Sequence, residues 1–280
     1  MQRLRRSWHL ARASWAVLKA DWSLLRFPLI SSVVSAVLGL FVLVLLWSAG
    51  VFADGSGEGS SASILNYVGV FLLYLVTSFV IVYCNTALIS LVLARFNGRP
   101  LTGDVGWEAS RRRWRQILGW SSIVATVGVI LSILRDRGQL GEIAAGIGGA
   151  AWSLATFLVI PVLVVEDVGP MDAAKRSVSL LRRTWGEQIV GNAGIGLVTG
   201  LAMFVVILLG VGLIALASMT GSAVVIVVAA IPVVLAVAAV VAISTALGSI
   251  YQAAVYQYAT GAPAQGFGEP DLLSTAFTRS

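Results

Sequence analysis

The sequence has few of the residues that make a protein surface polar or build a reactive centre. Charged residues occupy 11% of its 280 positions, against about a quarter in ordinary soluble proteins. Its one cysteine, Cys84, cannot form an internal disulfide, and its one histidine, His9, cannot build a multi-histidine metal site. Nucleotide-binding Gly-Lys-Ser loops, Gly-x-Ser-x-Gly elbows and His-Glu-x-x-His helices are also missing. We therefore expect no catalytic residue, no cofactor and no metal site.

Apolar residues make up 58% of the sequence, and the mean hydropathy is +0.91. They are gathered into uncharged blocks of about 20 residues or more, the length that crosses the hydrocarbon of a bilayer. Six blocks qualify, at 27–52, 64–94, 116–134, 143–165, 189–217 and 223–258. The sequence predicts an all-α integral membrane bundle of six transmembrane helices in one domain, 1–258, followed by a tail, 259–280. Pro161 and Pro232 are the expected kinks.

Lys and Arg are distributed very unevenly between the two sides that these blocks define. With the N-terminus inside, all but Arg135 and Arg137 of the 19 basic residues fall in inner segments. Because basic flanks stay in the cytoplasm, we expect a multi-pass protein of the cell membrane with both termini cytoplasmic. The net charge of +6 lies beside the apolar blocks, so its expected partner is anionic lipid and not nucleic acid.

The N-terminal segment predicts an amphipathic helix that lies on the membrane. Its apolar positions recur at steps of four and three, which is one helical face. They are Leu4, Trp8, Ala11, Trp15, Leu18 and Trp22. Arg5, Arg12 and Lys19 follow one flank of this face. Indole rings beside long cations suit the headgroup boundary, where both can keep their polar ends in water.

This pattern recurs twice along the chain. Trp8-x-x-x-Arg12-x-x-Trp15 is matched by Trp107-x-x-x-Arg111-x-x-Trp114 and by Val178-x-x-x-Arg182-x-x-Trp185. Each copy precedes two apolar blocks, so the chain divides into three units, 1–94, 100–165 and 170–258, each an interfacial helix plus a transmembrane hairpin. The alternative is coincidence, because the membrane interface itself selects Trp and Arg in any inner loop.

The loop before the third copy carries helix-boundary residues and two carboxylates. Asp172 is expected to cap the following helix, and Pro170 to end the preceding segment. Glu166 and Asp167 are expected to form structural ion pairs rather than a catalytic site, since no second titratable partner for chemistry lies nearby. Their candidate partners are Lys175, Arg176 and the arginines of the middle loop.

Three stretches carry a resemblance to a known family. They are the run from Ser7-Trp8 to Ser14-Trp15-x-Val17-Leu18-Lys19-x-Asp21, the Phe27-Pro28 pair, and the stretch from Val164-Val165-Glu166-Asp167 to Ala173-Ala174-Lys175-Arg176-Ser177. The chain resembles a family of bacterial polytopic membrane proteins of unknown function. The third stretch is also similar to the membrane domain of some glycerophosphoryl diester phosphodiesterases. The resemblance implies a fold and no reaction, because the soluble phosphodiesterase barrel has no counterpart here.

The apolar blocks contain polar and small residues but no full charge, which argues against a proton relay or an ion-coupled pump. The polar residues are Asn85, Thr86, Ser90, Asn192, Ser244, Thr245, Gln252 and Gln257. They are interpreted as hydrogen-bonding contacts between helices, with a substrate path as the alternative. The glycines Gly146, Gly148, Gly149, Gly196 and Gly200 are likewise interpreted as sites of close helix packing, with a glycine-lined solute path as the alternative.

These observations favour a non-catalytic scaffold or accessory protein that contacts anionic lipid or a partner membrane protein. The competing function is a small-solute transporter or channel component, and an intramembrane enzyme comes third. The expected membrane anchors are Trp8, Arg12, Trp15, Trp22, Trp107, Arg111, Trp114, Arg182 and Trp185. A transport path would use Asn85, Thr86, Asn192 and Gln252. The sequence leaves the oligomeric state open.

Overall fold

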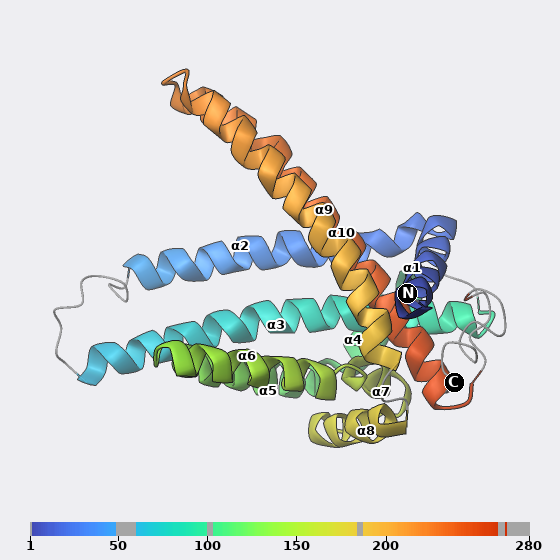
Figure 1. The fold of residues 1–280 in the computed structure, drawn as a ribbon. Coiled ribbons are helices and arrows are strands. Elements are labelled where there is room, and N and C mark those ends of the chain that lie inside the picture. Colours follow the sequence, from blue (N-terminus) through green and yellow to red (C-terminus); the bar gives the residue numbers. More distant parts are fainter. Residues whose placement is uncertain (1, 49–59, 100–102, 184–186, 263–266, 268–280) are drawn as a thin grey trace. The chain divides into compact units, whose positions relative to one another are not determined.

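The computed structural model describes residues 2–48, 60–99, 103–183, 187–262 and 267 (Figure 1). Within these residues the chain is helical and contains no strand, which confirms the predicted all-α class. In chain order the helices are α1 (Gln2–Ala20), the 3-10 helix η1 (Trp22–Leu25), α2 (Arg26–Ser48), α3 (Ser60–Phe96), α4 (Gly103–Arg112), α5 (Trp114–Arg135), α6 (Gln139–Ala155), α7 (Val159–Val165), α8 (Pro170–Arg183), α9 (Glu187–Ser218) and α10 (Ala223–Ala259).

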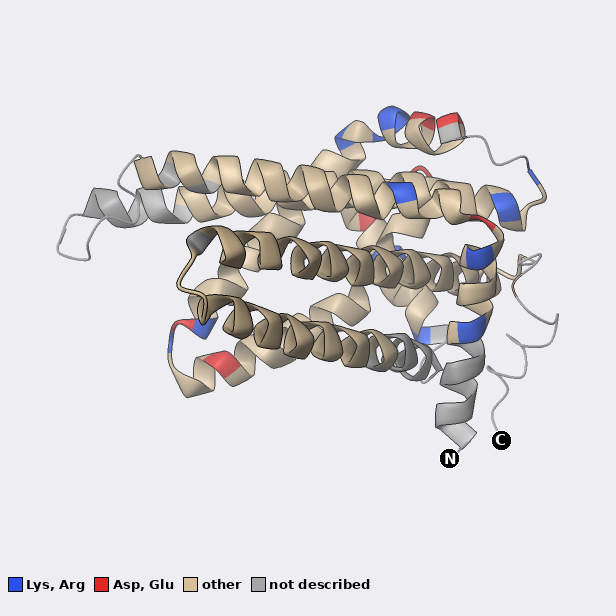
Figure 2. Ribbon diagram, turned by 90° about the horizontal axis from the view of Figure 1, so that it is seen from above, with Lys and Arg blue, Asp and Glu red and all other residues tan. Residues whose placement is uncertain are grey.

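Six helical stretches are long and apolar enough to cross a membrane, as predicted. They are Trp22–Val42, Val68–Phe96, Trp114–Arg135, Gln139–Val165, Val198–Ser218 and Val224–Ala259. Figure 2 shows that charged residues lie mainly on the short helices, at helix ends and in connections, whereas the long helices are uncharged over most of their lengths. Lipid is therefore the natural surrounding for these stretches, because hydrocarbon cannot solvate charge.

Two glycines allow the chain to leave α3 and α10. Gly98 (φ 67°) and Gly261 (φ 73°) adopt the left-handed conformation, in which a Cβ atom is unfavourable. The Gly98 and Gly261 amides donate to the carbonyl oxygens of Arg95 and Tyr258. Such caps satisfy carbonyls that a helix end otherwise leaves without partners.

The chain forms two compact units, the first of which comprises residues 33–94 and 100–183. In it α5 packs against α6, where the rings of Trp120 and Trp152 stack with centroids 5.8 Å apart. Helix α3 approaches α5 closely, because a Cβ on Gly128 would lie 3.2 Å from the Tyr74 ring. The Ser78 hydroxyl donates to the Ser121 carbonyl oxygen at 3.3 Å, which joins the same two helices.

The second unit comprises residues 1–32, 95–99 and 184–280. Its helices α9 and α10 pack against each other, and α1 packs against both. The two helices approach closely at Gly210, where an added Cβ would lie 2.5 Å from Val233 Cγ1. The Ser244 hydroxyl also donates to Thr199 Oγ1 at 3.3 Å, so the predicted interhelical role of Ser244 is confirmed. The proposed domain and repeat boundaries stay predictions.

The two prolines act differently. The fourth apolar block is broken into α6 and α7 by a turn at residues 156–158, just before Pro161. Proline lacks an amide hydrogen and its ring clashes with the carbonyl four residues earlier, which here belongs to Phe157. Helix α10, in contrast, continues through Pro232 without a break.

The prediction that glycines make close helix contacts is only partly right. Gly148 and Gly149 do contact Leu131 of α5, since added Cβ atoms would lie 3.5 and 3.7 Å from its methyl carbons. Gly196 and Gly200 do not, because no described atom lies within 4 Å of a Cβ at either position, and the same holds for Gly146. The spacing of two glycines does not reveal whether another helix lies opposite them.

Candidate lipid-contacting surface

Helix α4 packs tightly against α3. At Gly106 an added Cβ would lie 2.8 Å from the Ala87 carbonyl oxygen, so only glycine fits this approach. One turn later the Ser110 hydroxyl donates to the Tyr83 carbonyl oxygen at 2.8 Å, and the rings of Trp107 and Tyr83 stack. Gly106 and Ser110 are both buried, so this face of α4 is committed to protein contact.

Helix α8 packs at the break in the fourth apolar block. There Ser177 is fully buried, and its hydroxyl donates to the Ala155 carbonyl oxygen at 2.7 Å. The Ser177 hydroxyl oxygen in turn accepts the Leu158 amide at 3.1 Å. Because the turn at 156–158 interrupts the helical hydrogen bonds, these two backbone groups would otherwise lack partners inside an apolar region. Ser177 therefore repairs the break.

Helix α1 has a buried side that the sequence did not predict. The buried side chains are Ala13, Ser14, Val17 and Leu18, whereas Trp15 is 39% exposed. This side packs against α9 and α10. Leu18 lies only 60° from Trp15 around the helix, so the buried side overlaps one edge of the predicted tryptophan face. Helix α1 also ends at Ala20, and its continuation begins with the Asp21 cap of η1.

Helices α4 and α8 dock with the same motif positions, and all three helices expose the arginine of the motif. The residues five positions before the arginine in α4 and α8, Gly106 and Ser177, are both buried, as are those one position before it, Ser110 and Leu181. The arginines themselves, Arg12, Arg111 and Arg182, are all exposed. One side of each helix thus packs on protein while the arginine remains available to an external partner.

The predicted tryptophan anchors fall into two groups. Trp22 (52%) and Trp114 (48%) are exposed like Trp15. The Trp15 and Trp22 rings meet edge to face with centroids 5.9 Å apart, and the Arg115 guanidinium lies 5.4 Å from the Trp114 ring centroid. Trp107 is only half-exposed because it packs on Tyr83. The side chains of Trp8 and Trp185 lie outside the described residues.

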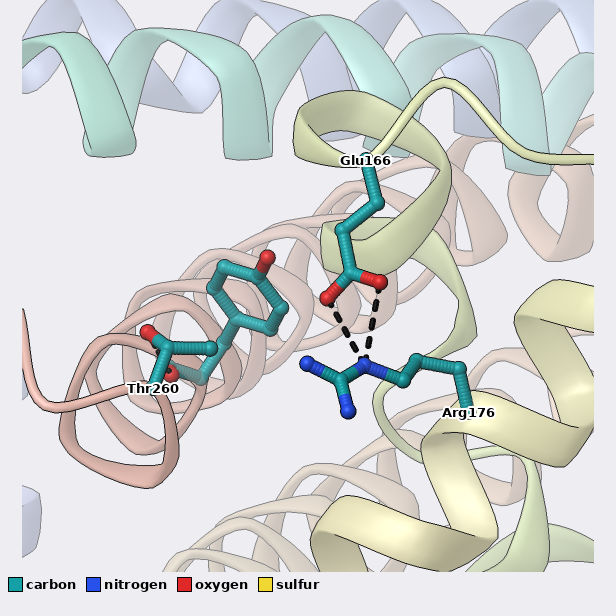
Figure 3. Close-up of polar contacts among 4 residues, drawn as sticks. Glu166, Arg176 and Thr260 are labelled. Atoms are coloured by element: carbon teal, nitrogen blue, oxygen red, sulfur yellow. Dashed lines mark hydrogen bonds and ion pairs between the residues drawn. The ribbon is translucent and has the colours of Figure 1, made fainter.

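The carboxylates after α7 form ion pairs, as predicted. Both Glu166 oxygens accept from Arg176 Nε at 3.0 Å, and neither side chain is fully exposed (Figure 3). Asp167 Oδ1 lies 3.7 Å from Nε of Arg113, an arginine of the middle loop; this separation is a charge contact rather than a hydrogen bond. Together they join the α7–α8 connection to α8 and to the junction of α4 with α5.

The expected cap of α8 is wrong by three residues. The helix begins at Pro170, a favourable first position because proline has no amide hydrogen to satisfy. Gly169 is therefore the capping residue, and its carbonyl oxygen accepts the Ala173 amide. Asp172 lies in the first turn, where its negative charge interacts favourably with the positive end of the helix dipole. Its carboxylate also pairs with Lys175 at 3.5 Å.

The polar residues of the apolar blocks make different kinds of contact. The Thr86 and Ser90 hydroxyls bond to carbonyl oxygens of their own helix, at Val82 and Thr86, and so join no second helix. Gln257 Nε2 lies 3.5 Å from Asn97 Oδ1. Asn85 and Gln252 are each partly exposed and each have a partner. The side chain of Asn192 lies outside the described residues.

Three residues that position these helices escaped prediction: Gly106, Ser110 and Ser177. Ser177 occurred in a quoted motif without a role, because its partners are backbone atoms about 20 positions earlier in the chain. The available signal was the recurrence of small residues four apart opposite the arginine, at 106 and 110. Small residues at that spacing permit close helix approach.

The chain belongs to a family of unknown function, DUF6159, which it matches over residues 64–267. The matched region extends from α3 to the end of the described chain and includes α4 and α8 with their docking contacts. No curated protein and no solved structure matches the chain.

Proposed function

We propose that this member of the DUF6159 family is a non-catalytic membrane scaffold or accessory protein of the cell membrane. In this proposal both termini are cytoplasmic, and α1, α4 and α8 hold anionic headgroups of the inner leaflet through Arg12, Arg111 and Arg182. The observation that carries the proposal is the exposure of all three arginines, at one motif position, on helices whose other side is docked on protein.

The docking contacts support this role because they fix where each arginine lies. A helix held only by lipid can rotate about its axis, whereas α4 and α8 are held by Gly106, Ser110 and Ser177. The exposed indole rings of Trp15 and Trp114, three positions after Arg12 and Arg111, suit the headgroup region, where Trp and Arg together bind interfaces. A fixed array of cations and rings can order lipid or hold an acidic membrane partner beside it.

Transport receives less support from the same contacts. Broken transmembrane helices in transporters bind ions or substrates through freed backbone groups at the break. In this chain the Ala155 carbonyl and the Leu158 amide are both engaged by Ser177. These two backbone groups at the break are therefore already hydrogen-bonded and are not available to bind a substrate or ion.

The lipid proposal is tested with two variants of equal charge change. Arg111→Glu with Arg182→Glu reverses the charge of two docked helices, whereas Arg135→Glu with Arg137→Glu reverses two exposed arginines at the α5–α6 connection, next to Asp136. Each purified protein in neutral detergent is titrated with phosphatidylglycerol and with phosphatidylcholine, and the affinity is measured by thermophoresis.

We expect the first variant to lose at least about tenfold in affinity for phosphatidylglycerol and little for phosphatidylcholine, since each basic residue near an anionic surface contributes about 1 kcal/mol. The control variant should change either affinity by less than about twofold. Equal losses in the two variants, or equal losses for the two lipids, would contradict the proposal.

Topology is tested separately. A reporter that is active only in the cytoplasm, inserted at Gly221 in the α9–α10 turn, should be inactive, and the same reporter at the C-terminus should be active. The reverse pattern would place the arginine-bearing helices outside the cell and end the inner-leaflet proposal.

A further inference from the structure

A groove of about 520 Å³ lies between α2 and α3. From α2 it is lined by Ser35, Gly39 and neighbouring apolar residues, and from α3 by Leu73, Tyr74 and Thr77. Its volume is typical of sites that hold a small molecule, and mostly apolar walls with a few polar groups are typical of such sites. All of its lining residues belong to the unit of residues 33–94 and 100–183.

The groove lies deep within the apolar stretches. Along α2 the nearest charged residue to Ser35 is Arg26, nine positions away or roughly 14 Å at 1.5 Å per residue. Along the described part of α3 the nearest to Thr77 is Arg95, which is farther still. A bilayer has about 30 Å of hydrocarbon, so a headgroup held near Arg26 would not reach the groove. Any occupant must be soluble in hydrocarbon.

One wall of the groove offers an unused hydrogen-bond donor. Ser35 Oγ is buried and has no hydrogen-bond partner among the described residues. Three residues earlier the Ser32 hydroxyl bonds to the Pro28 carbonyl oxygen at 2.8 Å, which is the usual solution for serine in a membrane helix. Thr77 and Tyr74 bring two further hydroxyl-bearing side chains to the facing wall. A simple acyl chain would leave these groups without partners.

We propose that this groove binds a lipid-soluble molecule that carries an oxygen acceptor, such as a ketone, within an apolar body. The Ser35 hydroxyl donates to that oxygen while Gly39 and Leu73 contact the apolar body. Glycine at position 39 keeps the groove open, because an added Cβ would lie 3.9 Å from Leu73 Cδ1 and a larger side chain would extend into the space. The site does not involve the arginine surface, so either proposal can fail without the other.

An alkyl benzophenone is a suitable probe, because it has an apolar body and one ketone and inserts into nearby C–H bonds on illumination. A long-chain alkyl diazirine without oxygen serves as the comparison probe. Labelled peptides from the full-length protein in neutral detergent are identified by mass spectrometry. The variants are Ser35→Ala, Gly39→Phe to fill the groove, and Val44→Phe as a control at an exposed position of α2 outside it.

We expect benzophenone to label residues 35–40 and 73–77 more strongly than the exposed positions 224–235 of α10. Ser35→Ala should reduce this labelling about fivefold and leave diazirine labelling unchanged, since one hydrogen bond is lost. Gly39→Phe should remove groove labelling by both probes. Val44→Phe should leave groove labelling by both probes unchanged.

Groove labelling no stronger than that of α10 would overturn the proposal. So would an equal loss of both probes in Ser35→Ala, which would indicate an acyl-chain slot without recognition of oxygen. Ser35→Ala keeps the helix intact, so it remains informative if Gly39→Phe does not fold.

Discussion

Helices α4 and α8 occupy corresponding places in the chain and dock with the same face, but through different chemistry. Helix α4 meets an unbroken α3, so docking requires backbone to approach backbone, and Gly106 allows this by having no side chain. Helix α8 meets a broken helix, so docking requires a donor and an acceptor, and Ser177 supplies both. Whether glycine or serine is required at the equivalent position, 106 or 177, therefore depends on whether the opposite helix is continuous or broken, and not on the amphipathic helix itself.

The largest expected effect is that of Gly106→Val. Its Cβ would lie 2.8 Å from the Ala87 carbonyl oxygen, a backbone atom that cannot move away, so α4 must separate from α3. We expect a loss of about 3 kcal/mol in the free energy of unfolding. Unfolding in detergent is measured by the reaction of a fluorogenic thiol reagent with Cys84. This cysteine is the one in the chain and is 4% exposed, so it reacts when the protein unfolds.

Gly146→Val is the matched control, because a Cβ there meets no atom within 4 Å while the helix-propensity cost is similar. If both variants lose the same stability, the loss comes from propensity and close docking of α4 is not important.

A smaller loss, about 2 kcal/mol, is expected for Ser177→Ala, because the substitution leaves a buried carbonyl and a buried amide without a partner. Ser179→Ala, on the exposed side of the same helix, should change stability by less than about 0.5 kcal/mol. The same thiol assay measures both. A Ser177→Ala protein as stable as the wild type would mean that the break at 156–158 needs no repair by α8.

The third amphipathic helix extends the comparison to a change of opposite sign. Ser14 of α1 is fully buried, yet its hydroxyl has no hydrogen-bond partner among the described residues. A buried hydroxyl without a partner costs desolvation free energy, and removing the hydroxyl removes that cost. Ser14→Ala should therefore leave stability unchanged or raise it by up to about 1 kcal/mol. Ser110→Ala in α4 should lower stability, because that hydroxyl has a partner. Equal destabilisation by both would show that Ser14 is in fact bonded.

Much of the fold follows from the sequence. All six apolar stretches were predicted, and the second, third, fourth and sixth agree to within four residues at each end, because uncharged length is a local property that hydrocarbon thickness selects directly. The first extends beyond the span found by ten residues at its end, and the fifth begins nine residues before it. The ion pairs of Glu166 and Asp167 were also predicted, since few cations lie within reach of that loop. The exposure of Arg12, Arg111 and Arg182 agrees with the predicted motif, because a charged side chain avoids a buried helix face.

The sequence was less informative about which neutral residues touch. Gly196 and Gly200 have the spacing of a packing motif, yet a Cβ at either would meet no described atom within 4 Å, whereas Gly210, which has no glycine four residues away, packs against Val233. In a helix whose residues are nearly all apolar, periodicity no longer distinguishes the side that meets protein from the side that meets lipid.

The sequence by itself determined that the chain is helical, that six of its stretches suit hydrocarbon and where its cations lie, because each of these depends on composition over a short stretch. Only the tertiary structure decided that Gly106 must be glycine, that Ser177 completes a broken helix and that Ser35 faces a groove. These roles depend on atoms of a second helix, and nothing in the local sequence of either helix records how closely the two approach.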